Sequence, residues 1–321
     1  ELYQNLTKDL EIHSIPGIAY MKDETLVKST ARAKIKELTT LPFPDRSGIP
    51  IEKYLDTWKT HHGKKTLNIS TQRGCPYTCK WCSTAVYGQS YRRNSPARVV
   101  EEIKDLIEKF DVEALWFVDD VFTVSHKWIN ELHGEFEKQG LKIPFECITR
   151  AERLNDTVLQ QLKQMGCFRI WIGAESGSQK IIDKMDRRVS LEVVQKMMTR
   201  TQELEMEAGT FIMVGYPDEL HEDITATLKH IENCNPDQLT ITQAYPIKGT
   251  DLYNEIENSI LVKPDWETST DREIKFKLPY SEKYYKNAIR FLVNGWQAKK
   301  YNSKKSAIKS KLALTLMNKL K

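Results

Sequence analysis

The sequence of 321 residues lacks the features that mark several common protein classes. No apolar run approaches the ~20 residues that a membrane span requires, and no secretory signal peptide is visible. Six cysteines are too few for a disulfide scaffold in a chain of this length. No low-complexity segment is evident. We therefore expect a soluble protein of the reducing cytoplasm that buries a full hydrophobic core.

Acidic residues are missing from the carboxyl-terminal segment, residues 299–321, which contains eight lysines. The net charge of +4 is therefore local, since the rest of the chain carries a net negative charge. One interpretation of this segment is a solvated, frayed helix. The other is a basic amphipathic helix over 303–321 that lies on an anionic membrane surface. Its apolar residues would be Ile308, Leu312, Leu314, Leu316, Met317 and Leu320.

The most informative feature that is present is a C-x3-C-x2-C array, formed by Cys75, Cys79 and Cys82 directly after an apolar run. Three thiols on one short loop cannot pair off evenly as disulfides, and they suit an iron–sulfur cluster. No fourth cysteine lies nearby, because the other three are distant and lie in apolar segments. These distant cysteines are Cys147, Cys167 and Cys234. A 4Fe–4S cube held by three thiolates leaves one iron open to a substrate.

An alternative for the same loop is a zinc knuckle in which His61 or His62 supplies the missing ligand. Structural zinc sites normally use paired short spacings at both ends of the ligand set. The second pair is absent from this sequence. The array therefore favours the cluster over zinc.

From Leu67 onward, β-rich runs alternate with helical patterns, which is typical of βαβ units and a parallel α/β sheet. Ser95, Ser125 and Asp156 are expected to begin three of the intervening helices. Spacing alone does not separate an open (β/α)6 arc from a doubly wound sheet. The predicted strands cover residues 67–71, 114–118, 145–149, 168–173, 210–215 and 239–245.

Polar or kinked residues follow these predicted strands. In an open barrel of parallel strands, the residues that follow the strands gather at one end, where the cysteine loop also lies. A single polar residue at a strand exit is ordinary, but the coincidence of several exits with the cysteine loop favours a functional site. The residues are Asp119, Asp120, Arg150, Glu175, Ser176, Tyr216, Pro217, Tyr245 and Pro246.

The cysteine loop resembles the hallmark C-x3-C-x-aromatic-C of the radical S-adenosylmethionine (SAM) superfamily, with Trp81 as the aromatic residue. Further segments from about Leu41 to Tyr253, including WFVDDVFT, TRAERL, FIMVGYPDE and YPIKGTDLY, look like the cobalamin-dependent branch. The resemblance implies a partial (β/α)6 barrel over 64–250, with an N-terminal linker over 1–63 and a C-terminal helical extension over 251–321.

The cobalamin domain of that branch usually carries a D-x-H-x-x-G signature, which this sequence lacks. The chain also begins with Glu1 rather than Met. We therefore expect a fragment or a processed form, in which the cobalamin domain either precedes Glu1 or is missing.

The resemblance also assigns residues to the cofactors. Cys75, Cys79 and Cys82 would hold the catalytic 4Fe–4S cluster. Asp119 or Asp120 would approach the amino group of the methionine moiety of SAM, and Arg150 its carboxylate. Glu175 and Ser176 would contact the ribose or polar groups of the methionine moiety. The remaining cofactor-binding residues would be Trp81 beside the adenine, Gly215 in the strand-five motif, and Tyr245.

The function that this resemblance implies is cleavage of SAM to a 5′-deoxyadenosyl radical, used for cobalamin-linked methylation of an unactivated centre. A radical cyclase or rearrangement enzyme, a methylthiotransferase and a non-enzymatic zinc-binding module stay open as alternatives. The expected partners are a small-molecule or lipid substrate and an electron donor such as flavodoxin or ferredoxin. A peripheral membrane contact through the basic tail is also expected, whereas nucleic acid is not.

Overall fold

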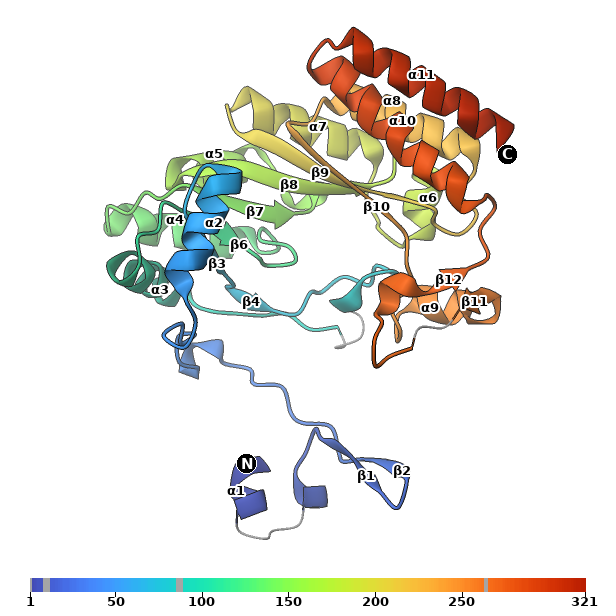
Figure 1. Ribbon diagram of the computed structural model, residues 1–321. Helices are drawn as coiled ribbons and strands as arrows, with labels where there is room; N and C mark the ends of the chain where they lie inside the picture. Colours follow the sequence, from blue (N-terminus) through green and yellow to red (C-terminus); the bar gives the residue numbers. More distant parts are fainter. Residues whose placement is uncertain (1, 8–11, 85–88, 263–264) are drawn as a thin grey trace. The chain divides into compact units, whose positions relative to one another are not determined.

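The computed structural model describes residues 2–7, 12–84, 89–262 and 265–321, and it divides into two compact units, 1–41 and 42–321 (Figure 1). The first unit contains helix α1 (Leu2–Thr7) and a hairpin of β1 (Ala19–Lys22) and β2 (Thr25–Lys28). Asp23 and Glu24 join the two strands with φ values of 46° and 63°. Positive φ at both positions is what a two-residue hairpin turn with the right twist requires.

The second unit is built on a six-stranded sheet in which every neighbouring pair is parallel. The strands follow one another across the sheet in chain order, with β3 and β10 at the edges. This order confirms the open arc and differs from a doubly wound sheet, in which the order reverses at a switch point. The strands are β3 (Thr66–Ile69), β6 (Ala114–Phe117), β7 (Phe145–Thr149), β8 (Cys167–Glu175), β9 (Glu207–Val214) and β10 (Gln238–Gln243).

Helices connect these strands and cover one face of the sheet (Figure 1). As predicted, Ser95 and Ser125 cap their helices, and each hydroxyl accepts a hydrogen bond from a backbone N–H in the first turn. Helix α5 begins at Asp156 as predicted, but its cap is the preceding Asn155, whose side chain accepts from the N–H of Val158 at 2.9 Å. The connecting helices are α3 (Pro96–Lys109), α4 (His126–Lys138), α5 (Asp156–Met165), α6 (Gln179–Lys184), α7 (Leu191–Glu203) and α8 (His221–Cys234).

The two faces of the sheet have different chemistry. On the helix-covered face, Phe117 packs against Phe122 and Phe145, with ring centroids 4.5 and 5.1 Å apart. The opposite, inner face is polar and aromatic: Glu146 accepts hydrogen bonds from Arg169 at 3.0 Å and from Trp171 at 2.8 Å. Apolar packing therefore holds the helices on the sheet, and the inner face is left for polar chemistry.

The segments before and after the barrel also contribute to the second unit. Helix α2 (Ile51–His62) leads into β3 and buries Leu55 in the main core. Helix α10 packs on α8, where a side chain at Gly295 would meet Leu228 at 2.4 Å. None of the described helices is long and apolar enough to cross a membrane. The C-terminal elements are α9 (Asp251–Ile256), β11 (Ile260–Val262), β12 (Lys275–Phe276), α10 (Glu282–Lys300) and α11 (Lys304–Lys319).

Helix α11 corrects one expectation for the tail. The segment is not a frayed helix, because α11 packs along α10 and buries Ser310, Ala313 and Met317. Ser310 also donates its hydroxyl to the carbonyl oxygen of Phe291 at 2.9 Å. Residues 42–321 form one compact unit, so the structure does not test the boundaries predicted at residues 63 and 250. These boundaries stay predictions.

Candidate active site

The cysteine loop begins at the carboxyl end of β3, beside a short ladder of β4 (Gln72–Arg73) and β5 (Arg92–Arg93). Gly74 opens the loop with φ +79°, and a Cβ there would lie 2.4 Å from Oγ and 2.6 Å from the backbone oxygen of Ser90. Only glycine fits this position without displacing the backbone. The sequence R-G-C therefore sets the path of the chain into Cys75.

Asp119 anchors the start of this loop. Its buried carboxylate accepts hydrogen bonds from the backbone N–H groups of Thr71 at 2.7 Å and Gln72 at 3.1 Å. Arg93 forms an ion pair with it at 3.3 Å, and the Arg93 guanidinium lies 3.4 Å over the ring of Trp128. Burial lowers the pKa of Arg93, and the Asp119 carboxylate opposes this shift. Asp119 therefore joins the exits of β3 and β6, and it does not line the cavity described next.

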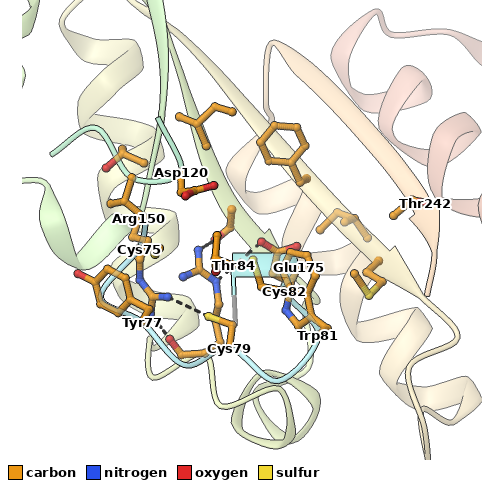
Figure 2. A pocket seen from close by; sticks show the side chains of 18 of the residues that line it. Cys75, Tyr77, Cys79, Trp81, Cys82, Thr84, Asp120, Arg150, Glu175 and Thr242 are labelled. Atoms are coloured by element: carbon orange, nitrogen blue, oxygen red, sulfur yellow. Dashed lines mark hydrogen bonds and ion pairs between the residues drawn. The ribbon is translucent and has the colours of Figure 1, made fainter. Parts of the chain in front are cut away.

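A cavity of about 320 Å³ lies at the carboxyl ends of the strands, between them and the cysteine loop (Figure 2). This volume is within the range of small-molecule and cofactor sites. The three cysteines of the loop, here called the loop cysteines, contribute to its wall. Each later strand or its exit adds a lining residue, among them Asp120, Arg150, Glu175, Met213 and Thr242.

The described structure offers no complete ligand set for a zinc ion. A zinc ion needs sulfur and nitrogen ligands that converge on one point, with Zn–S distances of ~2.3 Å. In the described part of the chain, no three His, Cys, Asp or Glu side chains converge in that way. His62 stacks on Trp58 at the end of α2, which leads into the amino end of β3, away from the loop. A cube can take one thiolate on each of three irons, so its ligands surround it instead of converging.

Burial affects the loop thiols directly. It raises the pKa of the Cys75 thiol to about 11 and also raises the pKa of Cys82. Metal binding requires the thiolate, so bound iron would supply the positive charge that offsets this burial. Thr84 donates its hydroxyl to the sulfur of Cys82 at 3.3 Å.

Arg150 reaches the loop from the end of β7. Its buried guanidinium donates to the sulfur of Cys79 at 3.3 Å and lies 4.0 Å over the ring of Tyr77 (Figure 2). It also donates to the carboxylate of Glu152 and to the backbone oxygen of Arg187. These four contacts hold the guanidinium in one place, against a predicted cluster ligand.

Glu175 reaches the cavity through an irregular end of β8. A register shift separates Gly173 from Glu175, and Glu175 has φ +65°. A Cβ at Gly173 would lie 2.5 Å from Oε1 of Glu175, so glycine leaves room for this carboxylate. Burial raises the pKa of Glu175, whereas Arg187 and Arg150 lower it. Arg187 lies 3.8 Å from the carboxylate.

Arg187 is a cavity residue that the sequence reasoning missed. It is buried, lines the cavity and donates to the backbone oxygen of Gly173 at 3.0 Å. It follows α6 and does not stand at a strand exit, so a search of strand exits passes over it. The Arg-Arg pair in DKMDRRVS was the available signal.

Besides Asp119, three predicted residues do not line the cavity. The Ser176 hydroxyl accepts from the N–H of Ser178 at 3.1 Å, and the N–H of Gly215 donates to Glu219 at 2.6 Å. Tyr245 lies 5.5 Å beneath the guanidinium of Arg272. The cavity therefore brings together the loop cysteines with Trp81, Asp120, Arg150 and Glu175. It leaves out Asp119, Ser176, Gly215 and Tyr245.

Trp81 carries an unused donor at this cavity. Its indole Nε1 is shielded from solvent and has no hydrogen-bond partner in the described part of the chain. Buried polar atoms normally have partners, so each exception needs an explanation. A ligand acceptor in the cavity would provide one.

Comparison with known proteins agrees with this geometry. The profile of the radical SAM superfamily matches residues 69–231. The chain is 28% identical over 291 residues to the uncharacterized methyltransferase PH0819 of Pyrococcus horikoshii, covering 89% of this chain and 62% of the relative. It is 25% identical over 251 residues to the anaerobic magnesium-protoporphyrin IX monomethyl ester cyclase of Rubrivivax gelatinosus, covering 77% and 44%.

Among solved structures, the radical SAM methyltransferase TsrM from Kitasatospora setae, with cobalamin and a [4Fe-4S] cluster bound, has the same fold. The TM-score is 0.69 at 14% identity, covering 85% of this chain and 57% of TsrM. The chain thus spans between about two fifths and three fifths of the length of these proteins.

Proposed function

Because this chain belongs to the radical SAM superfamily, we propose that it catalyses cobalamin-linked methyl transfer to an unactivated centre. The observation that carries the proposal is one cavity in which the loop cysteines face Asp120, Arg150 and Glu175 from three successive strand exits. The similarity to PH0819, named a methyltransferase, supports methyl transfer as the reaction. The fold shared with cobalamin-bound TsrM supports the cofactor.

The loop cysteines would hold a 4Fe–4S cluster and leave one iron facing the cavity. When bound, such a cluster supplies the electron that divides SAM into methionine and a 5′-deoxyadenosyl radical. The chain's own contribution is to position SAM and to exclude water. The enclosing strand exits and the buried lining residues are suited to both tasks.

Each charged residue of the cavity has a partner of matching chemistry in SAM. The exposed carboxylate of Asp120 would accept from the methionine amino group. Glu175 would accept from the two ribose hydroxyls, because a carboxylate offers two acceptor oxygens. Arg150 or Arg187 would face the methionine carboxylate, and the free Nε1 of Trp81 would donate beside the adenine.

Cobalamin has no assigned residues in this chain. The sequence lacks the D-x-H-x-x-G signature. The part of the proposal that concerns cobalamin therefore depends on similar proteins. The second candidate is a radical cyclase, which the similarity to the Rubrivivax enzyme favours. Both candidates use the same cluster and the same SAM cavity, and they differ in whether a methyl group moves.

The proposal is tested by following both fates of SAM. The anaerobically reconstituted chain is reduced and incubated with SAM, with and without reduced cobalamin. We expect 5′-deoxyadenosine in both cases, and S-adenosylhomocysteine only with cobalamin, because its formation reports methyl transfer from SAM to the cobalt. Formation of 5′-deoxyadenosine alone, with cobalamin bound, would favour the cyclase. The matched control is Cys79→Ala, which should form neither product.

A further inference from the structure

Helix α11 has two apolar sides that face in opposite directions. One side packs on α10 through Ala313 and Met317, with Leu314 and Leu320 partly buried against the same core. These residues therefore do not serve an external surface, although the sequence pattern places them with the other apolar residues of the tail. Figure 1 shows α11 as the outer helix of the C-terminal pair, so its second side faces away from α10.

The second side carries an exposed apolar stripe. Ile308, Leu312 and Leu316 are 69%, 60% and 38% exposed. They stand four residues apart, and this spacing places them in one row on a helix. Monomeric proteins seldom leave three large aliphatic side chains in a row in water without a use for them.

Lysines flank this stripe. At 100° per residue, Lys305 and Lys309 fall on one side of the row and Lys311 on the other, while Lys304 continues the row four residues before Ile308. Within the described residues, none of these four forms a salt bridge, whereas Lys300 is paired with Asp237 at 2.5 Å. Residues 299–321 contain no acid that could neutralise them. The row and its lysines are called the lysine-flanked stripe below.

We propose that the lysine-flanked stripe binds α11 to an anionic membrane surface. An apolar row inserts among the acyl chains while the neighbouring lysines attract lipid phosphates. The stripe is too short and too exposed to span a bilayer, so the chain lies on the surface. This contact is independent of the proposed methyl transfer and requires neither cluster nor cobalamin.

Charge favours an anionic membrane surface over a second copy of the chain as the partner of the lysine-flanked stripe. A second copy of the chain would bring its own unpaired lysines against the first set, and like charges in an interface are unfavourable. The stripe is also a single row of three exposed side chains on the outer helix of the C-terminal pair. A flat surface with many negative charges satisfies both the row and its flanks.

The test uses the full chain and two variants with the same change of charge. Leu312→Glu places a carboxylate in the row, and Asn318→Glu places one on the same helix, about 120° around from it. Both positions are exposed, so both variants should keep the helix, which circular dichroism checks. Binding is measured by flotation with vesicles of phosphatidylglycerol and phosphatidylcholine, and with vesicles of phosphatidylcholine alone.

We expect the parent chain to float with the mixed vesicles and to be released by high salt. Leu312→Glu should weaken binding about tenfold or more, since it removes one inserted aliphatic side chain and adds repulsion. Asn318→Glu should weaken it much less. Equal flotation of all three proteins would overturn the proposal. The proposal would also be overturned if the parent chain did not bind the vesicles and instead formed a dimer that Leu312→Glu abolishes. The stripe would then bind a second copy of the chain.

Discussion

Replacement of Asp119 by asparagine should destabilise the fold, whereas the same replacement of Asp120 should not. Oδ1 of Asp119 accepts from two backbone N–H groups, and Oδ2 faces the hydroxyl of Thr71 and the guanidinium of Arg93. An asparagine keeps one acceptor oxygen but turns a second donor group toward Arg93. Asp120, in contrast, is exposed at the cavity wall.

The expected magnitude follows from the burial of the pair. The Asp119 and Arg93 side chains are 0% and 4% exposed, and breaking one partner of such a buried pair costs ~3–5 kcal/mol. This is a large part of the ~5–15 kcal/mol that stabilises a typical protein. Asp120→Asn should change the free energy of unfolding by less than ~0.5 kcal/mol, as exposed substitutions usually do.

Urea unfolding, followed by circular dichroism, measures both free energies of unfolding, and equilibrium dialysis with labelled SAM measures binding to the reconstituted chains. Asp120→Asn should weaken SAM binding by ~1.5–3 kcal/mol, the value of one charged hydrogen bond. If Asp119→Asn is as stable as the parent and Asp120→Asn is not, then the assignment of the two carboxylates is reversed. If neither variant affects SAM binding, the placement of the methionine amino group is wrong.

Further predictions follow from the loop and the strand-five exit. Alanine at any loop cysteine should abolish iron binding after anaerobic reconstitution, whereas alanine at any of the distant cysteines should not; iron content measures both. Arg150→Gln should lower the midpoint potential of the cluster, because it removes a cationic donor from the sulfur of Cys79. A redox titration followed by electron paramagnetic resonance measures this potential. An unchanged potential would mean that Arg150 contacts only SAM. Burial raises the pKa of Glu219 from 4.5 to about 8. Between these two pH values the native chain therefore binds more protons than the unfolded chain. The free energy of unfolding should fall by roughly 1.4 kcal/mol per pH unit as the pH rises across this range. Glu219→Gln should flatten that fall in urea unfolding between pH 5 and about 8, and an unchanged slope would contradict it.

The architecture was predictable because the strands, of four to nine residues, are rich in apolar and β-branched residues and are followed by polar residues. Each of the six predicted strands overlaps an observed one, and the cysteine loop leaves the first. The helix starts at Ser95 and Ser125 were predictable for a similar local reason. Asn155 and Asp156 are neighbours that both suit a cap, so only the backbone conformation distinguishes them.

The individual roles of site residues were less predictable, because they depend on the direction in which each side chain points where the strand ends. Asp119 and Asp120 follow the end of β6 at Phe117, and there Asp119 is buried whereas the adjacent Asp120 is exposed at the cavity. At β8, the irregularity between Gly173 and Glu175 shifts the pairing, and this turns Glu175 toward the cavity and leaves Ser176 outside. No sequence period reveals such a shift.

The central claim is that the cavity holds SAM on the open iron of a cluster bound by the loop cysteines. Electron–nuclear double resonance on the reduced, reconstituted chain tests it most directly, with SAM that carries ¹⁵N in its amino group. A hyperfine coupling between the cluster and this nitrogen is the expected result. A reduced cluster that binds SAM but shows no coupling to the nitrogen would contradict the claim.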